Sequence, residues 1–168
     1  MSAVVSDTSP LQYLVLCGAV NILPVLFRDV LIPPTVFKAL QHAHTPLPVR
    51  EWAQELPGWV RVQAPVRLDA SLEVDEGERE AISLAREVQA TAVLIDDHKG
   101  RLAALRCGLR VTGTVGLLEA GADRGLLNLS KAVELLRETN ARLDDDLIRA
   151  ALLRDRSRQI SRGPRPPA

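Results

Sequence analysis

The chain has 168 residues, which suits one domain with a sizeable core, and hydrophobic residues make up 46% of it. Aromatic residues contribute only 3%, so the core has to be built mainly from Leu, Val, Ile and Ala. No apolar run approaches the roughly 18 residues that a membrane helix needs. The two cysteines have no metal-ligand spacing, and the first residues do not resemble a secretory signal. We therefore expect a cytoplasmic protein that does not enter the membrane.

The charge is balanced overall but unevenly distributed. Lys and Arg together number 21, as do Asp and Glu, which gives a net charge of zero. From Arg154 onward the chain carries a surplus of four positive charges, so the preceding body has a net charge of −4. An acidic body repels nucleic acid in general, but it agrees with a cluster of carboxylates that a cation neutralises. The basic end of the chain suits either a nucleic-acid contact or a solvated terminus.

Short apolar runs alternate with segments of helical periodicity along the chain. Strands are expected at residues 3–6, 30–32, 59–62, 92–95 and 109–112. Helices are expected at residues 10–17, 22–27, 33–42, 49–56, 76–89, 98–107, 115–122, 131–141 and 145–154. This alternation is typical of an α/β fold with a mostly parallel sheet covered by helices. We expect one domain over residues 1–155 and a disordered Arg- and Pro-rich tail over residues 156–168.

Acidic residues follow two of the expected strands. Asp7 ends the first strand, and Asp96 and Asp97 end the apolar run at residues 92–95. Ligands of parallel α/β sheets bind beyond the carboxyl ends of the strands, and Mg²⁺ and Mn²⁺ prefer oxygen ligands. These acids therefore suit a cation site. Both positions also precede helices, where Asp serves as an N-cap without any metal.

Further acids lie at the start of the helix expected at residues 76–89. Asp75 and Glu78 have the spacing of a capping box, which gives Glu78 a structural role. Glu80 lies beside Ala81 and one turn before Leu84, at the margin of the apolar face of this helix. An unpaired carboxylate is costly there unless it binds a cation, so we prefer Glu80 to Glu78 as a ligand.

Four segments of the chain resemble the PIN-domain family. They are VVSDTSPL at residues 4–11, GEREAISLA at 77–85, LIDDHKGR at 94–101 and VTGT at 111–114. Their order and spacing are preserved over residues 4–152, and the last segment matches a compact bacterial branch similar to VapC-type toxin ribonucleases. The resemblance implies a three-layer α/β/α fold with a mostly parallel central sheet.

The resemblance also implies which residues form the active site. The metal-site acids would be Asp7, Glu80 and Asp97. Asp96 stays an alternative to Asp97, and Glu78 stays an alternative to Glu80, because the alignment of these segments fits either choice.

Other residues would support the acids or contact the substrate. Ser9 would orient the first aspartate, and Thr114 would support the site. Lys99 and Arg101 are the first candidates for contacts to the substrate.

The activity that the resemblance implies is metal-dependent hydrolysis of RNA phosphodiester bonds. Such an endoribonuclease uses Mg²⁺ or Mn²⁺ and is often the toxin of a toxin–antitoxin pair. The expected partners are therefore an RNA substrate, an antitoxin protein and a second copy of the chain in a homodimer.

One departure from the family pattern favours a different interpretation. Ala39 stands where the family usually has a glutamate, and a methyl group binds no metal; His42 lies one turn further along. The chain is alternatively a catalytically degenerate member that binds RNA or a protein without cleavage. A receiver-like phosphotransfer domain would need an acid pair after the first strand, where this chain has only Asp7.

Overall fold

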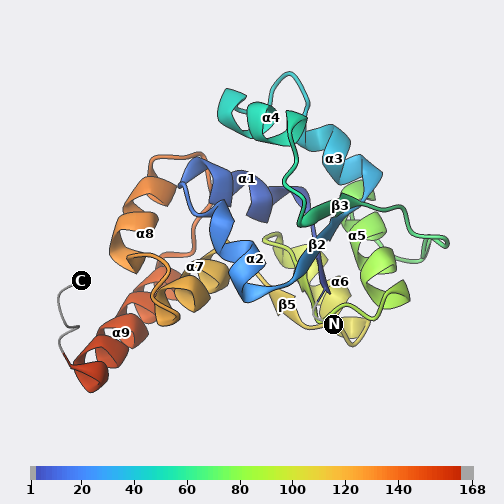
Figure 1. The fold of residues 1–168 in the computed structure, drawn as a ribbon. Coiled ribbons are helices and arrows are strands. Elements are labelled where there is room, and N and C mark those ends of the chain that lie inside the picture. Colours follow the sequence, from blue (N-terminus) through green and yellow to red (C-terminus); the bar gives the residue numbers. More distant parts are fainter. Residues whose placement is uncertain (1–2, 164–168) are drawn as a thin grey trace.

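The computed structural model describes residues 3–163, in which strands and helices alternate as the sequence predicts (Figure 1). The strands are β1 (Ala3–Ser6), β2 (Asp29–Ile32), β3 (Val60–Val62), β4 (Ala92–Leu94) and β5 (Val111–Thr112). The helices of the first half are α1 (Thr8–Leu16), the 3₁₀ turn η1 (Val20–Ile22), α2 (Leu23–Leu26), α3 (Pro34–Leu40) and α4 (Leu47–Gln54). Those of the second half are α5 (Glu76–Glu87), α6 (His98–Arg106), α7 (Thr114–Asp123), α8 (Leu129–Arg137) and α9 (Asp145–Arg162).

The strands of the described region form one parallel sheet in the order β3-β2-β1-β4-β5. Parallel pairing follows from the helical segments that connect successive strands, because each connection returns the chain to the same end of the sheet. After β1 the chain adds β2 and β3 on one side, and then β4 and β5 on the other. The direction of winding therefore switches between β1 and β4.

Alternate side chains of each strand face opposite helical layers. Val4 and Leu94 pack into the larger core, together with residues of α1, α3, α4, α7, α8 and α9. Val5, Leu31 and Val93 pack against α5 and α6 on the other face. Strands that are buried on both faces explain the continuous apolar runs in the sequence. The predicted three-layer α/β/α architecture is confirmed.

The C-terminal helix is longer than the sequence predicts. Helix α9 continues to Arg162, so the prediction of disorder from residue 156 is wrong for residues 156–162; residues 164–168 lie outside the described residues. The basic composition of this segment is typical of a solvated tail. The segment is instead helical, and carboxylates of α7, which is distant in the sequence, neutralise its arginines.

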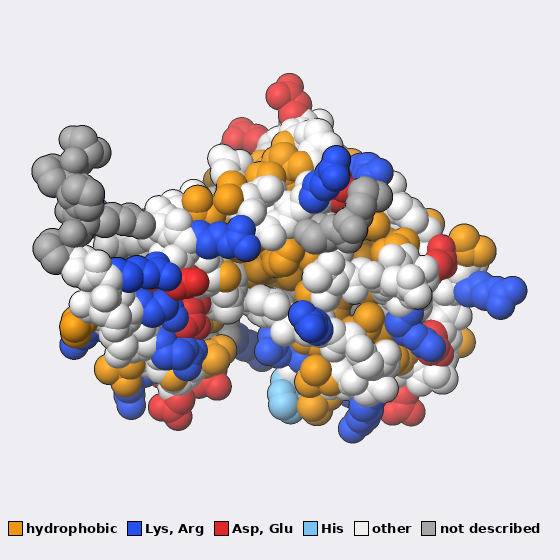
Figure 2. All heavy atoms as spheres, turned by 60° about the horizontal axis from the view of Figure 1, so that its bottom comes forward, with side chains coloured by type: hydrophobic (Ala, Val, Ile, Leu, Met, Phe, Trp, Pro, Cys, Tyr) orange, Lys and Arg blue, Asp and Glu red, His pale blue; other side chains and the backbone are white. Residues whose placement is uncertain are grey.

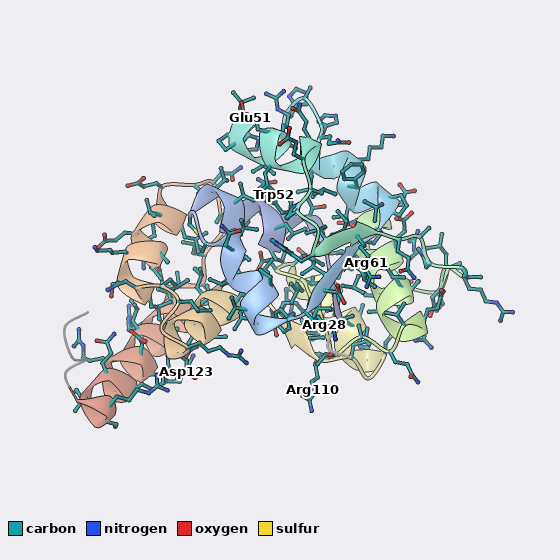
Figure 3. All side chains as sticks on the ribbon, viewed as in Figure 1. Arg28, Glu51, Trp52, Arg61, Arg110 and Asp123 are labelled. Atoms are coloured by element: carbon teal, nitrogen blue, oxygen red, sulfur yellow. The ribbon has the colours of Figure 1, made fainter. Side chains whose placement is uncertain are left out.

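Arginines of α9 at four-residue spacing bind those carboxylates. Arg154 contacts Glu119 through two hydrogen bonds of 2.7 and 2.9 Å, and Arg158 contacts the same carboxylate at 3.1 Å. Arg162 reaches Asp123 at 2.9 Å. Figure 2 shows basic side chains along α9 with acidic ones beside them, and Figure 3 labels Asp123 on α7. This network holds the last turns of α9 against α7.

Among the described residues, no single helix has both the length and the apolar character to cross a membrane. The bent pair Thr8–Leu16 and Val20–Leu26, whose axes differ by 114°, meets that test only when taken together.

We predict that Glu119→Gln lowers the free energy of unfolding by about 1–2 kcal/mol, because it removes the charge that Arg154 and Arg158 share. Urea denaturation followed by circular dichroism measures this loss. Glu134→Gln on the exposed face of α8 is the matched control. Equal denaturation midpoints for the two variants would contradict a stabilising role of the network.

Candidate active site

The residues that follow β1 and β4 meet at one edge of the sheet. Ser6 of β1 pairs with Leu94 of β4, and the backbone N–H of Asp7 donates to the carbonyl oxygen of Leu94 over 2.9 Å. Asp96 and Asp97 follow β4 after one intervening residue, Ile95. This edge is where the winding of the sheet switches, and it is the position at which folds of this class bind their ligands.

Asp7 and Asp75 approach each other beside Gly77, in the first turn of α5. Asp7 precedes α1 and is only 7% exposed, and Asp75 precedes α5. A Cβ atom on Gly77 would lie 3.4 Å from Asp7 Oδ1 and 3.6 Å from Asp75 Oδ1. Both distances are ordinary van der Waals contacts, so the two carboxylates lie close to the backbone of α5 at residue 77.

Glu78 is buried between α5 and α6. Its Oε2 accepts a hydrogen bond from the backbone N–H of Asp75 at 3.3 Å, and Asp75 Oδ1 accepts from the N–H of Glu78 at 2.8 Å. The predicted capping box is thus confirmed. Glu78 Oε1 is buried without a hydrogen-bond partner among residues 3–163. This oxygen packs against Gly100 of α6: a Cβ atom on Gly100 would lie 2.5 Å from Oε1 of Glu78.

Asp97 contacts the backbone of Gly100. Its Oδ2 accepts hydrogen bonds from the N–H groups of Lys99 at 2.9 Å and Gly100 at 3.2 Å, which caps α6. Gly100 therefore contacts both Glu78 and Asp97. We call Asp7, Asp75, Glu78 and Asp97 the carboxylate cluster.

Asp96 adjoins the carboxylate cluster but is held by α7. Its Oδ1 accepts from the N–H of Thr114 at 2.7 Å, and its Oδ2 accepts from the hydroxyl of Thr114 at 2.6 Å. Both oxygens of Asp96 thus have a donor from the buried Thr114. No hydrogen bond within the described region reaches Oδ1 of Asp97, which makes Asp97 the freer ligand of the two.

The electrostatics of the cluster follow from burial and mutual repulsion. Burial raises the pKa of Asp7 to about 7; the backbone amide of Thr8 opposes this shift, and the charges of Asp75, Asp96 and Asp97 add to it. Burial likewise raises the pKa of Glu78 to about 7, with the charges of Asp75, Asp7 and Asp97 acting in the same direction. The four acids therefore share one electrostatic environment, in which extra negative charge is unfavourable.

Glu80 does not join the carboxylate cluster. Its Oε2 accepts a hydrogen bond from the N–H of Thr35 at 3.1 Å, at the N-terminus of α3, where a negative charge is favourable. Two residues along a helix correspond to a rotation of roughly 200°, so Glu78 and Glu80 point to different neighbours. In this conformation Glu78 therefore lies near Asp7, Asp75 and Asp97, whereas Glu80 contacts α3; the preference for Glu80 as a ligand stays a prediction.

Two further sequence-based assignments are also not reflected in the contacts. Ser9 lies in the first turn of α1, but no hydrogen bond joins it to Asp7 among the residues that the structure describes; the hydroxyl of Ser6 instead donates to the carbonyl oxygen of Asp7 at 2.8 Å. His42 is exposed, and its Nδ1 accepts from the N–H of His44 at 3.2 Å. His42 therefore belongs to the turn after α3 rather than to the cluster.

Basic residues lie on two edges of the sheet. Lys99 is exposed in the first turn of α6, next to Asp97. Arg101 donates from Nη1 to the carbonyl oxygen of Ile95 at 3.0 Å, which holds it beside the residues that follow β4. Arg28 and Arg110, labelled in Figure 3, precede β2 and β5 and so lie at the opposite edge of the sheet. Lys99 and Arg101 are therefore the basic residues nearest the acids among these four.

The donor chemistry of the cluster fits a divalent cation. In this conformation no three His, Cys, Asp or Glu side chains of the described region converge closely enough to hold one ion. The cluster nevertheless offers only oxygen donors, which Mg²⁺ and Mn²⁺ prefer. None of its four acids forms a salt bridge within residues 3–163, and Glu78 Oε1 has no donor. A cation would supply the missing positive charge.

Asp75 and Tyr13 are the residues of this region that sequence reasoning missed. Asp75 was predicted only as a helix cap, although a glycine between it and Glu78 is a signal for close approach of neighbouring groups. The pKa of Tyr13 is raised by burial and by the charge of Asp96, which indicates that its phenol lies near the same edge. No periodicity in α1 distinguishes Tyr13 from a core residue.

The raised pKa values give the stability of the metal-free protein a defined pH dependence. Below about pH 4, Asp7 and Glu78 are protonated in both the folded and the unfolded chain, so the contribution of these acids to the free energy of unfolding is fully present. This contribution is lost as the pH rises through about 7, because the buried acids then have to ionise. We predict that Asp7→Asn in EDTA raises the free energy of unfolding at about pH 8 by on the order of 1–3 kcal/mol and flattens its pH profile. Asp146→Asn, at an exposed acid of α9, is the control. Identical profiles for wild type and Asp7→Asn would contradict the assignment.

Comparison with known proteins agrees with this geometry. A family model described as DUF3368, PIN domain, matches residues 3–156, which is most of the chain. A search of curated proteins found no match. The matched region contains the parallel sheet and the complete carboxylate cluster. The resemblance noted in the sequence is confirmed, and the chain belongs to the PIN-domain family, whose fold is of the nuclease type.

Proposed function

We propose that this protein is an endoribonuclease that hydrolyses RNA phosphodiester bonds with the help of Mg²⁺ or Mn²⁺. The observation that carries the proposal is the carboxylate cluster at the β1–β4 edge, where Glu78 Oε1 is buried and has no hydrogen-bond partner among residues 3–163. Removing charged acids from water is unfavourable unless a counter-charge binds them. PIN domains commonly act as nucleases with divalent metals, and an all-oxygen cluster agrees with that chemistry.

Asp7, Glu78 and Asp97 are the acids that we assign to the cation. The chemistry that a divalent ion supplies here is neutralisation of phosphate charge and acidification of water for in-line attack. Asp7 is fixed by its backbone hydrogen bond to Leu94, Glu78 by the capping box and Asp97 by its cap on α6. Three different elements thus hold the three acids, which limits their movement when charge changes at the site.

Substrate binding is assigned to the basic residues of α6. Lys99 is exposed near Asp97, and Arg101 is half-buried and bound to the carbonyl oxygen of Ile95, so both can contact the phosphates of a strand that enters the site. Thr114 and Asp96 form a neighbouring pair that leaves the acids of the cluster free for the cation. We further propose that an antitoxin-like protein and a second copy of the chain are partners, on the ground of the family resemblance.

A degenerate PIN protein that binds RNA or a partner without cleavage is the second candidate. The observation that favours it is Ala39 in α3, where the family pattern has a glutamate. Without that glutamate the site has one negative charge fewer than the family pattern provides. The two candidates differ in whether the remaining acids suffice for hydrolysis.

Incubation of the purified protein with a mixed pool of single-stranded RNA distinguishes the two candidates. We predict cleavage with Mn²⁺, none with EDTA, and a loss of at least about a hundredfold in Asp7→Asn. Glu80→Gln is the matched control, because Glu80 contacts α3 and should leave the rate within a few-fold. Inactive wild-type protein in which Ala39→Glu creates cleavage would support the degenerate candidate instead.

A further inference from the structure

Asp75 lies at the side of the carboxylate cluster that faces α3. Gly77 is the common neighbour: a Cβ atom there would lie 3.4 Å from Asp7 Oδ1, 3.6 Å from Asp75 Oδ1 and 3.7 Å from Cγ2 of Val36. Val36 belongs to α3, the helix that carries Ala39 one turn later. An aspartate that is not part of the family resemblance thus borders the site on the side where an acid is missing.

The backbone around Asp75 is fixed by specific contacts. Arg79 donates from Nε and Nη2 to the carbonyl oxygen of Leu72 at 3.2 and 3.1 Å, and from Nη2 to that of Val74 at 3.1 Å. The capping box with Glu78 holds Asp75 from the other direction. A long loop precedes α5, but these bonds give its last residue a defined position.

Asp75 has a free oxygen after it has capped the helix. Oδ1 accepts the N–H of Glu78, whereas no donor within residues 3–163 reaches Oδ2. The side chain is exposed, so capping does not require the second oxygen to be buried. The guanidinium of Arg79 is engaged with backbone carbonyls and forms no salt bridge with Asp75 within the described region.

A second observation points to a ligand at this position. Glu78, which shares the capping box with Asp75, is 3% exposed and has Oε1 without any donor among the described residues. Asp7, whose Oδ1 lies with that of Asp75 near the Cβ position of Gly77, is 7% exposed and forms no salt bridge among residues 3–163. Two buried acids and one exposed acid therefore lie at or next to Gly77, and none of them forms a salt bridge among the residues that the structure describes.

We propose that Asp75 is a fourth carboxylate ligand of the cation site and supplies the negative charge that Ala39 cannot. The inference rests on the proposed function, since it concerns the same cation. It assigns one residue two roles: Oδ1 caps α5, and Oδ2 binds the ion or a water molecule in its shell. The departure at Ala39 is then compensated from α5, which is distant from α3 in the sequence but adjacent to it in the fold.

Titration of the full-length protein with Mn²⁺ alone, followed by calorimetry at about pH 8 where the acids are ionised, tests this role. The variant is Asp75→Asn, because Asn caps a helix as well as Asp does but has no charge. We expect the dissociation constant of Mn²⁺ to rise about tenfold or more. Asp144→Asn is the matched control, since Asp144 caps α9 through the N–H groups of Asp146 and Leu147. Its Mn²⁺ affinity should equal that of wild type.

Asp7→Asn separates failure of this inference from failure of the proposed function. Loss of Mn²⁺ binding in Asp7→Asn together with wild-type affinity in Asp75→Asn would show that Asp75 is only a cap, and the proposed function would stand. Wild-type protein that binds no Mn²⁺, or an Asp7→Asn variant that binds it normally, would overturn both. Asp75→Ser also retains a capping oxygen, and it should show the same loss of affinity as Asp75→Asn if charge at residue 75 is what matters.

Discussion

The site depends on one constraint: acidic side chains are buried near the ends of β1 and β4, where water cannot stabilise their charge. Asp7 and Glu78 are almost fully buried, and their pKa values rise to about 7 because burial disfavours their charged forms. The backbone around them accommodates this arrangement through Gly100, where a Cβ atom would lie 2.5 Å from Oε1 of Glu78 and would collide with it. Such an arrangement lowers the stability of the empty protein near neutral pH and favours any cation that restores the balance of charge.

Helix capping and metal binding are combined in the same residues. Asp75, Asp97 and Asp7 each precede a helix, and the first two accept hydrogen bonds from its first turn. A capping carboxylate uses one oxygen for the helix and can keep the other for a ligand, so the two interpretations of these aspartates do not exclude each other. The fold thereby positions the acids by the same contacts that begin its helices. This explains how acids from separate elements are held at one edge of the sheet.

The alternating pattern of strands and helices could be predicted from the sequence because buried parallel strands read as continuous apolar runs. Asp7 and Asp97 could be located because strand ends of a parallel sheet share one edge. The different neighbours of Glu78 and Glu80 could not be predicted from the sequence, since they depend on Thr35 of α3, whose backbone N–H donates to Glu80. The length of α9 also depends on distant partners, because Glu119 and Asp123 of α7 neutralise its arginines. Local periodicity carries no information about either contact.

Diffraction from crystals grown with Mn²⁺, with data collected for its anomalous signal, tests the central claim most directly. We predict an anomalous peak at the β1–β4 edge, within coordination distance of carboxylate oxygens of Asp7 and Glu78. A well-ordered cluster without a peak at this edge, or a peak bound only by residues elsewhere, such as the exposed pair His42 and His44, would contradict it.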